Sequence, residues 1–247
     1  MKTVIIIPAR YGSTRLPGKP LLDRTGKPLI QHVVEAAARL QAGIDAIVVA
    51  TDDQRIADAV TAFGGQAIMT SADCRTGTDR LAEAAAKLRL ADDDIVVNVQ
   101  GDEPEMPPEN ISALLEVLKR TQAPMATLAT PLPAGQAGNP NKVKVVIDRN
   151  GRALYFSRSV IPFDRDAAGK TNYLLHLGIY AYRAGFLRQF AAMPATPAEE
   201  SEKLEQLRAL ENGFAIAAAV VQHAGAGIDT PEDYEQFVAK WRGMSRA

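Results

Sequence analysis

The chain has few of the residues on which several classes of protein depend. Its single cysteine, Cys74, excludes an intramolecular disulfide and a cysteine-rich zinc site. Its three histidines form neither a cluster with metal-ligand spacing nor a Ser-His-Asp arrangement. The formal net charge is −1, whereas general nucleic-acid-binding proteins carry a basic excess. Because the apolar runs are too short for a signal peptide or a membrane span, we expect a cytoplasmic protein that binds neither nucleic acid nor a membrane.

Two common signatures of phosphate-binding loops are also missing. A Walker A loop has four residues between its glycines and a Ser or Thr after its Lys. Here five residues separate Gly12 from Gly18, and Pro20 follows Lys19. No G-x-G-x-x-G fingerprint joins a strand to a helix. Since Pro17 disfavours helical backbone before it, we expect this loop to wrap phosphates as an extended ribbon rather than beneath a helix N-terminus.

The composition and the order of secondary-structure patterns predict an α/β fold. The 247 residues are 47% apolar and 23% charged, as in ordinary globular proteins. In the first half, strand-like and helix-like periods alternate, which predicts a mostly parallel sheet with helices on both faces. The expected strands are 3–7, 46–50, 66–69, 95–99 and 126–129, and the expected helices are 29–40, 54–63, 79–90 and 107–120.

The second half of the chain has a different pattern. Residues 143–147 and 153–156 read as a hairpin with Asn150-Gly151 at its tip. A strand at 175–182, a helix at 199–211, a strand at 216–221 and a helix with Pro231 at its first position are expected to follow. We interpret residues 1–247 as one domain, in which about 131–190 form an insertion that serves as a lid or a dimer face.

A loop of basic residues follows the first expected strand. Arg10, Arg15 and Lys19 leave the C-terminal end of that strand on a stretch rich in Gly and Pro. Ligands of open α/β sheets bind at this end of the strands. Guanidinium, ammonium and exposed amide groups suit a polyphosphate. We therefore predict that this loop is part of the active site, the alternative being a solvated basic turn.

Two carboxylates follow later strands of the expected sheet. Asp102 comes after strand 95–99, at the same sheet edge as the basic loop. A carboxylate there can hold Mg²⁺ together with substrate phosphates. The alternative for Asp102 is a turn residue before a helix, and Gly101 fits that reading. Asp229 either completes the metal site or helps to cap the helix that begins near Pro231, and the spacing leaves these two possibilities even.

Further polar groups follow other strands. Residues 51–52 and 75–80 offer hydroxyl and amide groups that could recognise a base or a ribose. Thr78 and Asp79 are equally suited to cap a helix. We interpret Cys74 as a bystander. His176 and Tyr180 lie on the same face of the strand at 175–182 because side chains alternate with period two.

Seven motifs, in order over essentially the whole chain, resemble those of the 3-deoxy-manno-octulosonate (Kdo) cytidylyltransferases, or CMP-Kdo synthetases. The resemblance implies a nucleotide-diphospho-sugar transferase fold and a homodimer. It also implies magnesium-dependent transfer of CMP from CTP to Kdo, for lipopolysaccharide synthesis. The motifs are the loop 7–20, Gly77-Thr78-Asp79-Arg80, Gln100-Gly101-Asp102-Glu103-Pro104, Tyr155-Phe156-Ser157-Arg158, His176-Leu177-Gly178-Ile179-Tyr180, Leu204-Glu205-Gln206-Leu207-Arg208 and Asp229-Thr230-Pro231-Glu232-Asp233.

The same resemblance implies a role for individual residues. The catalytic residues would be Arg15, Lys19, Asp102 and Asp229. Amphipathic packing is the alternative for Glu205 and Gln206, and residues 167–172 and 201–203 match less closely. The resemblance assigns Arg10, Arg15 and Lys19 to the triphosphate, Ala9, Gly77, Thr78, Arg80 and Gln100 to the rest of the nucleotide, Asp102 and Asp229 to magnesium, and Arg158, His176, Tyr180, Glu205 and Gln206 to the acidic sugar.

Other functions remain as alternatives. A related nucleotidyltransferase could use 8-amino-Kdo, sialic acid, a sugar 1-phosphate or methylerythritol phosphate as acceptor. The motifs around Arg158, His176 and Glu205 favour Kdo. A non-catalytic regulator would bind CTP with magnesium and release no pyrophosphate.

Overall fold

A computed structural model describes residues 1–12, 16–40, 43–166, 169 and 171–244. The chain divides into two compact units: unit 1 comprises residues 1–108 and 225–247, and unit 2 comprises residues 109–224. The interpretation of 1–247 as one domain, with a sugar-binding or dimerisation subregion at about 131–190, stays a prediction. Among the described residues, no helix is long and apolar enough to cross a membrane.

Unit 1 contains a parallel sheet whose strands appear in the order β3-β2-β1-β4. Its strands are β1 (Thr3–Ala9), β2 (Ala46–Thr51), β3 (Gln66–Met69) and β4 (Ile95–Asn98). All of these neighbours pair in parallel. The β1–β4 register, with Thr3 opposite Ile95, brings the carboxyl ends of the two strands side by side. The loops that follow these strands therefore emerge at the same edge.

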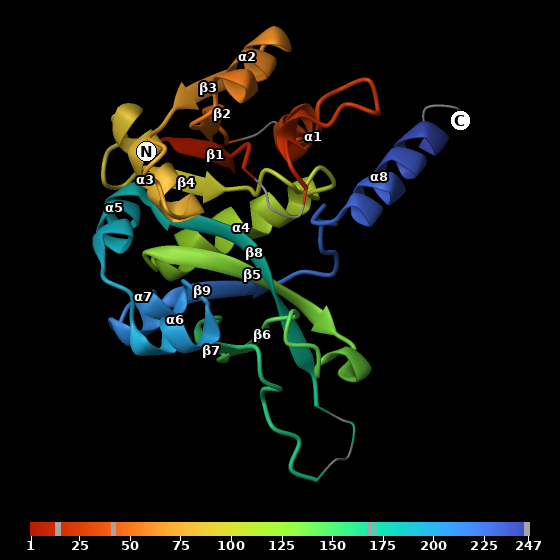
Figure 1. Ribbon diagram of the computed structural model, residues 1–247. Coiled ribbons are helices and arrows are strands. Elements are labelled where there is room, and N and C mark those ends of the chain that lie inside the picture. Colours follow the sequence, from red (N-terminus) through yellow and green to blue (C-terminus); the bar gives the residue numbers. More distant parts are fainter. Residues whose placement is uncertain (13–15, 41–42, 167–168, 170, 245–247) are drawn as a thin grey trace. The chain divides into compact units, whose positions relative to one another are not determined.

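Three helices of unit 1, α1, α2 and α3, pack along this sheet. α2 lies against β2 and β3, and α3 lies against β1 and β2 (Figure 1). α3 begins two residues before the expected start at Asp79, because Thr76 caps it. The Thr76 hydroxyl accepts a hydrogen bond from the Asp79 amide at 3.1 Å, and the Asp79 carboxylate accepts one from the Thr76 amide at 3.1 Å. The helices are η1 (Lys19–Leu21), α1 (Leu29–Ala38), α2 (Gln54–Ala62), α3 (Gly77–Lys87) and α8 (Pro231–Met244).

Helix α8 is anchored in unit 1 through an apolar cluster. The helix begins at Pro231, which confirms the expected start. The His32 ring of α1 packs edge-on against Trp241, with ring centroids 4.4 Å apart. These contacts hold α8 and the segment before it. That segment carries Asp229. The buried members of the cluster are Leu29, Ile228, Tyr234, Phe237 and Val238.

Unit 2 is built around a mixed sheet. β5 (Met125–Leu132) pairs antiparallel with β8 (Tyr173–Arg183) and parallel with β9 (Ile216–Val220). The expected hairpin is present as β6 (Lys144–Ile147) and β7 (Ala153–Ser157), which pair antiparallel. Gly151 has the positive φ of 76° that a tight hairpin turn requires.

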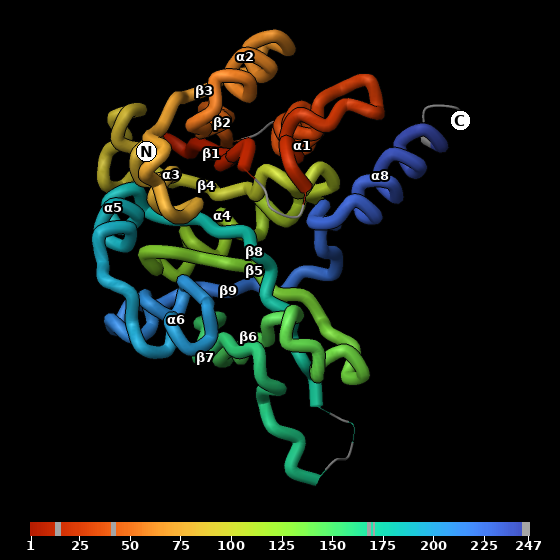
Figure 2. The backbone as a smooth tube through the Cα atoms, viewed as in Figure 1, coloured from red at the N-terminus to blue at the C-terminus, as the bar shows by residue number. Residues whose placement is uncertain are grey.

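The expected helix at 199–211 is wrong as a single element. Two short helices, α6 (Pro197–Glu202) and α7 (Leu207–Glu211), take its place. Lys203 ends α6 in the left-handed conformation, with φ 54°, and the next residue, Leu204, is buried. Figure 2 traces the hairpin strands β6 and β7 beside α6. The other helices of this unit are α4 (Pro108–Thr121), η2 (Ala134–Gln136) and α5 (Ala184–Ala192).

Candidate active site

The basic loop after β1 ends in a short helical turn. Lys19 opens the 3-10 helix η1, in which Pro20 occupies an N-terminal position. This corrects the expectation of an extended ribbon at that point. Gly18 precedes the turn with φ 65°, and a side chain there would approach the Tyr11 ring at 3.2 Å. Arg15 lies outside the described residues.

Lys19 brings together the two acids that the sequence singled out. Its Nζ donates a hydrogen bond to Asp102 Oδ2 at 2.6 Å and lies 3.6 Å from Asp229 Oδ1. It also donates to the carbonyl oxygen of Ile228 at 2.8 Å. The Ile228 amide in turn donates to the carbonyl oxygen of Asp102 at 2.9 Å, which ties the segment before α8 to the segment after β4. The structure therefore brings one cation and two carboxylates from three distant segments to a single point.

Gly101 permits the close approach of two loop backbones at this point. A Cβ atom at this position would lie 2.7 Å from the carbonyl oxygen of Pro8, which is shorter than real contacts allow. The contact brings the residue before Asp102 against the end of β1. Sequence reasoning recognised Gly101 only as a turn residue.

Asp229 does not cap α8. Thr230 and Asp233 form the cap: the Asp233 carboxylate accepts hydrogen bonds from the Asp229 and Thr230 amides at 3.0 and 2.9 Å. The Asp233 amide donates to the Thr230 hydroxyl at 3.2 Å. The Asp229 carboxylate instead faces Lys19, and its part in a metal site stays a prediction.

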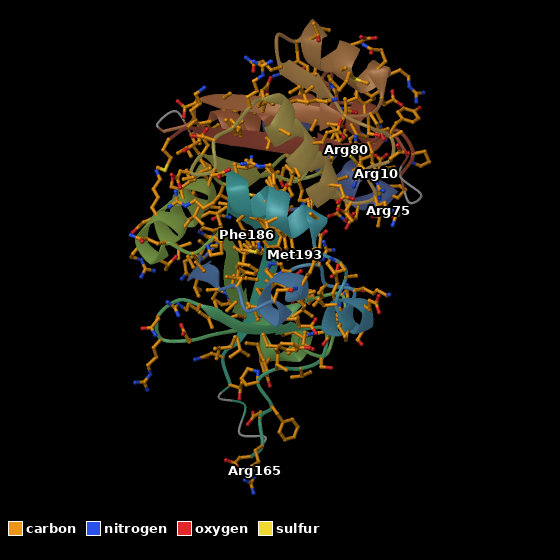
Figure 3. The ribbon with its side chains drawn as sticks, turned by 90° about the vertical axis from the view of Figure 1, so that its left-hand side faces the viewer. Arg10, Arg75, Arg80, Arg165, Phe186 and Met193 are labelled. Atoms are coloured by element: carbon orange, nitrogen blue, oxygen red, sulfur yellow. The ribbon has the colours of Figure 1, made fainter. Side chains whose placement is uncertain are left out.

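A cavity of about 340 Å³ opens beside Lys19. Eight of the predicted residues line it, and Thr78, which is buried in the first turn of α3, is not among them. Arg75 belongs to the segment 75–80 but was not singled out as a site residue; its exposed side chain lies with Arg10 and Arg80 at one edge of unit 1 (Figure 3). The lining residues are Pro8, Ala9, Arg10, Lys19, Pro20, Cys74, Arg75, Thr76, Gly77, Arg80, Gln100, Gly101, Asp102 and Asp229.

The guanidinium of Arg80 is fixed by neighbouring protein groups. It donates to Asp52 Oδ2 at 2.9 Å and to the Thr70 hydroxyl at 2.5 Å. Its side chain is 5% exposed, so the charge is directed by these partners rather than by solvent. Asp52, which the sequence offered for base or ribose recognition, is engaged here in orienting Arg80.

Cys74 lies at the cavity wall with an unreactive thiol. Burial, with a hydrogen bond from its Sγ to Glu83 at 3.2 Å, raises the pKa of Cys74 to about 11. A hydrogen bond from Lys87 lowers the pKa of Glu83 to about 2, so Glu83 keeps its negative charge. A thiol held in this state is a weak nucleophile at neutral pH. The interpretation of Cys74 as a bystander is in keeping with these contacts.

The donor set around Lys19 fits a magnesium ion. Among the described residues, no group of three or more His, Cys, Asp or Glu side chains is arranged to hold a metal. Asp102 and Asp229 supply two carboxylates at a point that already attracts the Lys19 ammonium. Burial, with the charge of Asp102 beside it, raises the pKa of Glu103 to about 8, which favours the protonated form of its carboxyl group. Mg²⁺ commonly takes one or two carboxylates and completes its shell with water and substrate phosphates.

The predicted sugar residues lie in unit 2. His176 and Tyr180 on β8 have ring centroids 5.5 Å apart, as the period-two pattern predicts. The Phe156 ring of β7 lies edge-on to His176 at 4.9 Å. Burial, with the charge of Glu205, raises the pKa of Tyr180. The Gln206 Nε2 is buried and has no hydrogen-bond partner within the described part of the chain.

The tautomer of His176 follows from its neighbour. The Thr127 hydroxyl has one proton to donate, and the carbonyl oxygens of Leu177 and Ile179 lie 3.0 and 2.9 Å from it. His176 Nε2, 3.0 Å from the same hydroxyl oxygen, is therefore assigned as the protonated nitrogen. Nδ1 is left as a hydrogen-bond acceptor. Burial lowers the pKa of His176 to about 3, so the ring is neutral at physiological pH.

This low pKa predicts a pH dependence of stability. Below pH 6.5 the unfolded chain binds a proton at His176 and the folded chain does not, so stability falls as pH drops from 6.5 towards 3. The expected loss is at most about 1.4 kcal/mol per pH unit. Urea unfolding between pH 7.5 and 5 should show a smaller pH slope for His176→Gln than for the control His223→Gln, an exposed histidine. Equal slopes in the two variants would contradict the assignment.

Arg158 is held by main-chain carbonyl groups. Its guanidinium donates to the carbonyl oxygens of Glu202 at 2.7 Å, Pro140 at 3.0 Å and Lys203 at 3.4 Å. A guanidinium has five N–H groups, so two are left after these three bonds with the described part of the chain. The assignment of these two N–H groups to the carboxylate of the sugar stays a prediction.

Comparisons with known proteins show the family of the chain. A family model described as cytidylyltransferase matches residues 4–217. The chain belongs to the cytidylyltransferase family. One solved structure, of CMP:2-keto-3-deoxy-manno-octonic acid synthetase complexed with CTP, is 48% identical with a TM-score of 0.93, over 99% of this chain and 100% of that chain.

A second solved structure shows the shared fold alone. A cytidylyltransferase from Leptospira borgpetersenii serovar Hardjo-bovis is 20% identical with a TM-score of 0.63, over 97% of this chain and 86% of that chain. The predicted family and α/β fold class are thus confirmed. As a cytidylyltransferase the protein is a nucleotidyltransferase, and enzymes of this kind generally use metal ions.

Proposed function

We propose that this cytidylyltransferase activates Kdo, converting CTP and Kdo into CMP-Kdo and pyrophosphate for lipopolysaccharide synthesis. The observation that carries the proposal is the meeting of Lys19 with Asp102 and Asp229 beside a cavity lined by the predicted nucleotide residues. The similarity to a CMP-Kdo synthetase bound to CTP supports CTP and Kdo as the substrates.

The nucleotide residues neutralise and orient the triphosphate. Arg10 and Lys19 line the cavity, and we assign them with Arg15 to the phosphate groups. Ala9, Gly77 and Gln100 line the same cavity and contact the remainder of the nucleotide, with Thr78 buried behind the wall in α3. Phosphoryl and nucleotidyl transfers depend mainly on positioning and charge neutralisation. Lys19 and Arg15 stabilise the negative charge that grows on the departing pyrophosphate.

Asp102 and Asp229 are the residues that would hold Mg²⁺. Once bound, the ion would act as a Lewis acid beside the phosphates and ease loss of the proton from the attacking hydroxyl. Asp102 follows β4 and Asp229 precedes α8, and the hydrogen bond from the Ile228 amide to the Asp102 carbonyl oxygen joins the two segments. The two negative charges of Asp102 and Asp229 would attract a cation that also binds the phosphates.

The residues of unit 2 recognise the acidic sugar. Two N–H groups of Arg158 receive its carboxylate. The His176 Nδ1 accepts from a hydroxyl group, while the unpartnered Gln206 Nε2 donates to an oxygen. Tyr180 and Glu205 complete the set. Because His176 is neutral, this recognition does not require a histidine proton at physiological pH.

In the reaction, the anomeric hydroxyl oxygen of Kdo attacks the α-phosphorus of CTP in line. A new oxygen–phosphorus bond forms, the bond to the β-phosphate bridging oxygen breaks, and pyrophosphate leaves with that electron pair. The proton of the attacking hydroxyl passes to solvent.

A matrix of substrates tests this function. Pyrophosphate release is measured with Mg²⁺ for four nucleoside triphosphates, each with Kdo, 8-amino-Kdo, sialic acid, a sugar 1-phosphate and methylerythritol phosphate. We expect turnover with CTP and Kdo to exceed every other combination by at least about tenfold. Preference for another acceptor would overturn the Kdo assignment. Binding of CTP without pyrophosphate release in any combination would indicate the regulator instead.

The homodimer and the cytoplasmic location also belong to the proposal. Large apolar side chains are exposed in the segment 154–163, within the predicted dimerisation subregion; Leu154 is 59% exposed and Phe163 is 82% exposed. Exposed apolar groups gathered in this way favour an interface. Sedimentation should give a mass of two chains, and a monomer at micromolar concentration would contradict the dimer.

A further inference from the structure

Lys144 is a charged residue with a fully buried side chain. It begins β6 and is 0% exposed. Its Nζ donates to two main-chain carbonyl oxygens, those of Arg158 at 2.5 Å and Asn139 at 3.2 Å. Burying an ammonium group is costly unless hydrogen bonds compensate for the lost hydration. Here those bonds hold the main chain of Arg158.

Glu202, the last residue of α6, holds the same residue from the other side. Its Oε2 accepts a hydrogen bond from the Arg158 amide at 2.9 Å, and its Oε1 accepts one from the Ser157 hydroxyl at 2.5 Å. Its carbonyl oxygen accepts from Arg158 Nε at 2.7 Å. The amide, the carbonyl and the side chain of Arg158 are thus all fixed by Lys144 and Glu202. The negative charge of Glu202 also counteracts the effect of burial, which lowers the pKa of Lys144.

Glu202 also lies directly before the turn that leads the chain to Glu205 and Gln206. Lys203 adopts φ 54° directly after it, and this break separates α6 from α7. The Lys203 carbonyl oxygen accepts a further hydrogen bond from Arg158. The contacts of Glu202 therefore join the end of β7 to the segment that carries the other predicted sugar residues.

We propose that Glu202 and Lys144 are positioning residues for the sugar acid: they orient Arg158 and hold it in register with Glu205 and Gln206. This inference rests on the proposed function, in which these three residues bind Kdo. Neither residue touches the nucleotide-binding cavity, because all of its lining residues belong to unit 1. Their loss should therefore weaken recognition of the sugar and leave CTP binding unchanged.

The first variant is Glu202→Gln. It keeps the size of the side chain but replaces a carboxylate oxygen with an amide NH₂ and removes the charge. A charge-assisted hydrogen bond to the Arg158 amide or to Ser157 is lost, and a buried donor is left without its acceptor. We expect the KM for Kdo to rise about 10- to 100-fold, with the KM for CTP within about twofold of the wild-type value. The matched control is Glu200→Gln, an exposed glutamate on the same helix.

Ser157→Ala keeps the test decisive if Glu202→Gln does not fold, and a double variant tests whether the effect passes through Arg158. Ser157→Ala removes only one of the contacts of Glu202, and we expect a rise of about 3- to 10-fold in the KM for Kdo. In a background that already contains Arg158→Ala, the Glu202 substitution should add less than about twofold, because its effect passes through Arg158. A purely structural role would instead lower the unfolding temperature by the same amount in both backgrounds.

The outcomes separate this inference from the function on which it rests. Selective loss of Kdo affinity in Glu202→Gln, with Glu200→Gln like the wild type, supports the positioning role. An active wild type with unchanged or equally weakened Kdo and CTP affinities in Glu202→Gln overturns the positioning role alone. A wild type that does not turn over CTP and Kdo overturns the proposed function and this inference with it.

Discussion

Lys19→Ala is expected to lower turnover on the order of a hundredfold or more while the fold is retained. The variant removes the cation that lies 2.6 Å from Asp102 and 3.6 Å from Asp229. Two carboxylates are then left facing each other without that positive charge, and the departing pyrophosphate loses a donor. Positive charge aimed at a leaving group contributes mainly in the transition state, so kcat should fall more than the affinity for CTP.

The measurement is pyrophosphate release at saturating CTP and Kdo, with far-UV circular dichroism to check the fold. Lys119→Ala, at an exposed lysine on α4, is the matched control and should keep wild-type turnover. A Lys19→Ala enzyme within about threefold of the wild type would contradict the assignment of Lys19 to the leaving phosphate.

Asp102→Asn is expected to reduce turnover by a similar factor, on the order of a hundredfold, and to weaken the dependence on Mg²⁺. The substitution keeps the shape of the side chain and one acceptor oxygen but removes the charge that attracts a divalent cation. Asp229→Asn should have the same effect in kind. Because both acids would serve one ion, the double variant should lose less than the product of the two single losses.

Titration with Mg²⁺ at saturating substrates checks this prediction. The half-saturating concentration of Mg²⁺ should rise at least about tenfold in either variant. Asp58→Asn, at an exposed aspartate of α2, should titrate like the wild type. Unchanged metal titrations in both active-site variants would exclude Asp102 and Asp229 as the metal ligands.

The meeting of Lys19 and Asp102 could be anticipated because parallel strands impose it. Once alternating strands and helices are recognised, the carboxyl ends of β1 and β4 must meet at one edge, and so must the loops that follow them. The apolar runs that mark these strands are buried on both faces and easily read from the sequence. Conversely, spacing could not decide between capping and metal binding for Asp229, since the cap depends on Thr230 and Asp233 in the folded chain.

Other features depend on contacts that periodicity does not encode. The helical pattern over 199–211 continues through Lys203, but α6 ends there, where Leu204 is buried and Glu202 accepts a hydrogen bond from Ser157. The restriction on Gly101 likewise arises from the carbonyl oxygen of Pro8, a distant residue in the sequence. Tertiary contacts decide such positions, and local propensity does not.

Arginine partners were equally hidden from the sequence. A motif can assign Arg80 to the nucleotide, but its bonds to Asp52 and Thr70 make its guanidinium part of the cavity wall. Arg75 carries no motif signal of its own beyond its place before the helix, although it lines the same cavity. No partner of Arg158 can be recognised from the sequence, whereas in the structure three carbonyl groups orient its guanidinium.

The central claim is that Asp102 and Asp229 hold a cation beside a triphosphate bound by Lys19. The most direct measurement is anomalous scattering from crystals grown with CTP and Mn²⁺ in place of Mg²⁺. The account predicts one manganese peak within about 2.3 Å of an oxygen of each carboxylate and of a phosphate oxygen. A manganese peak held elsewhere, with CTP bound away from Lys19, would contradict the account.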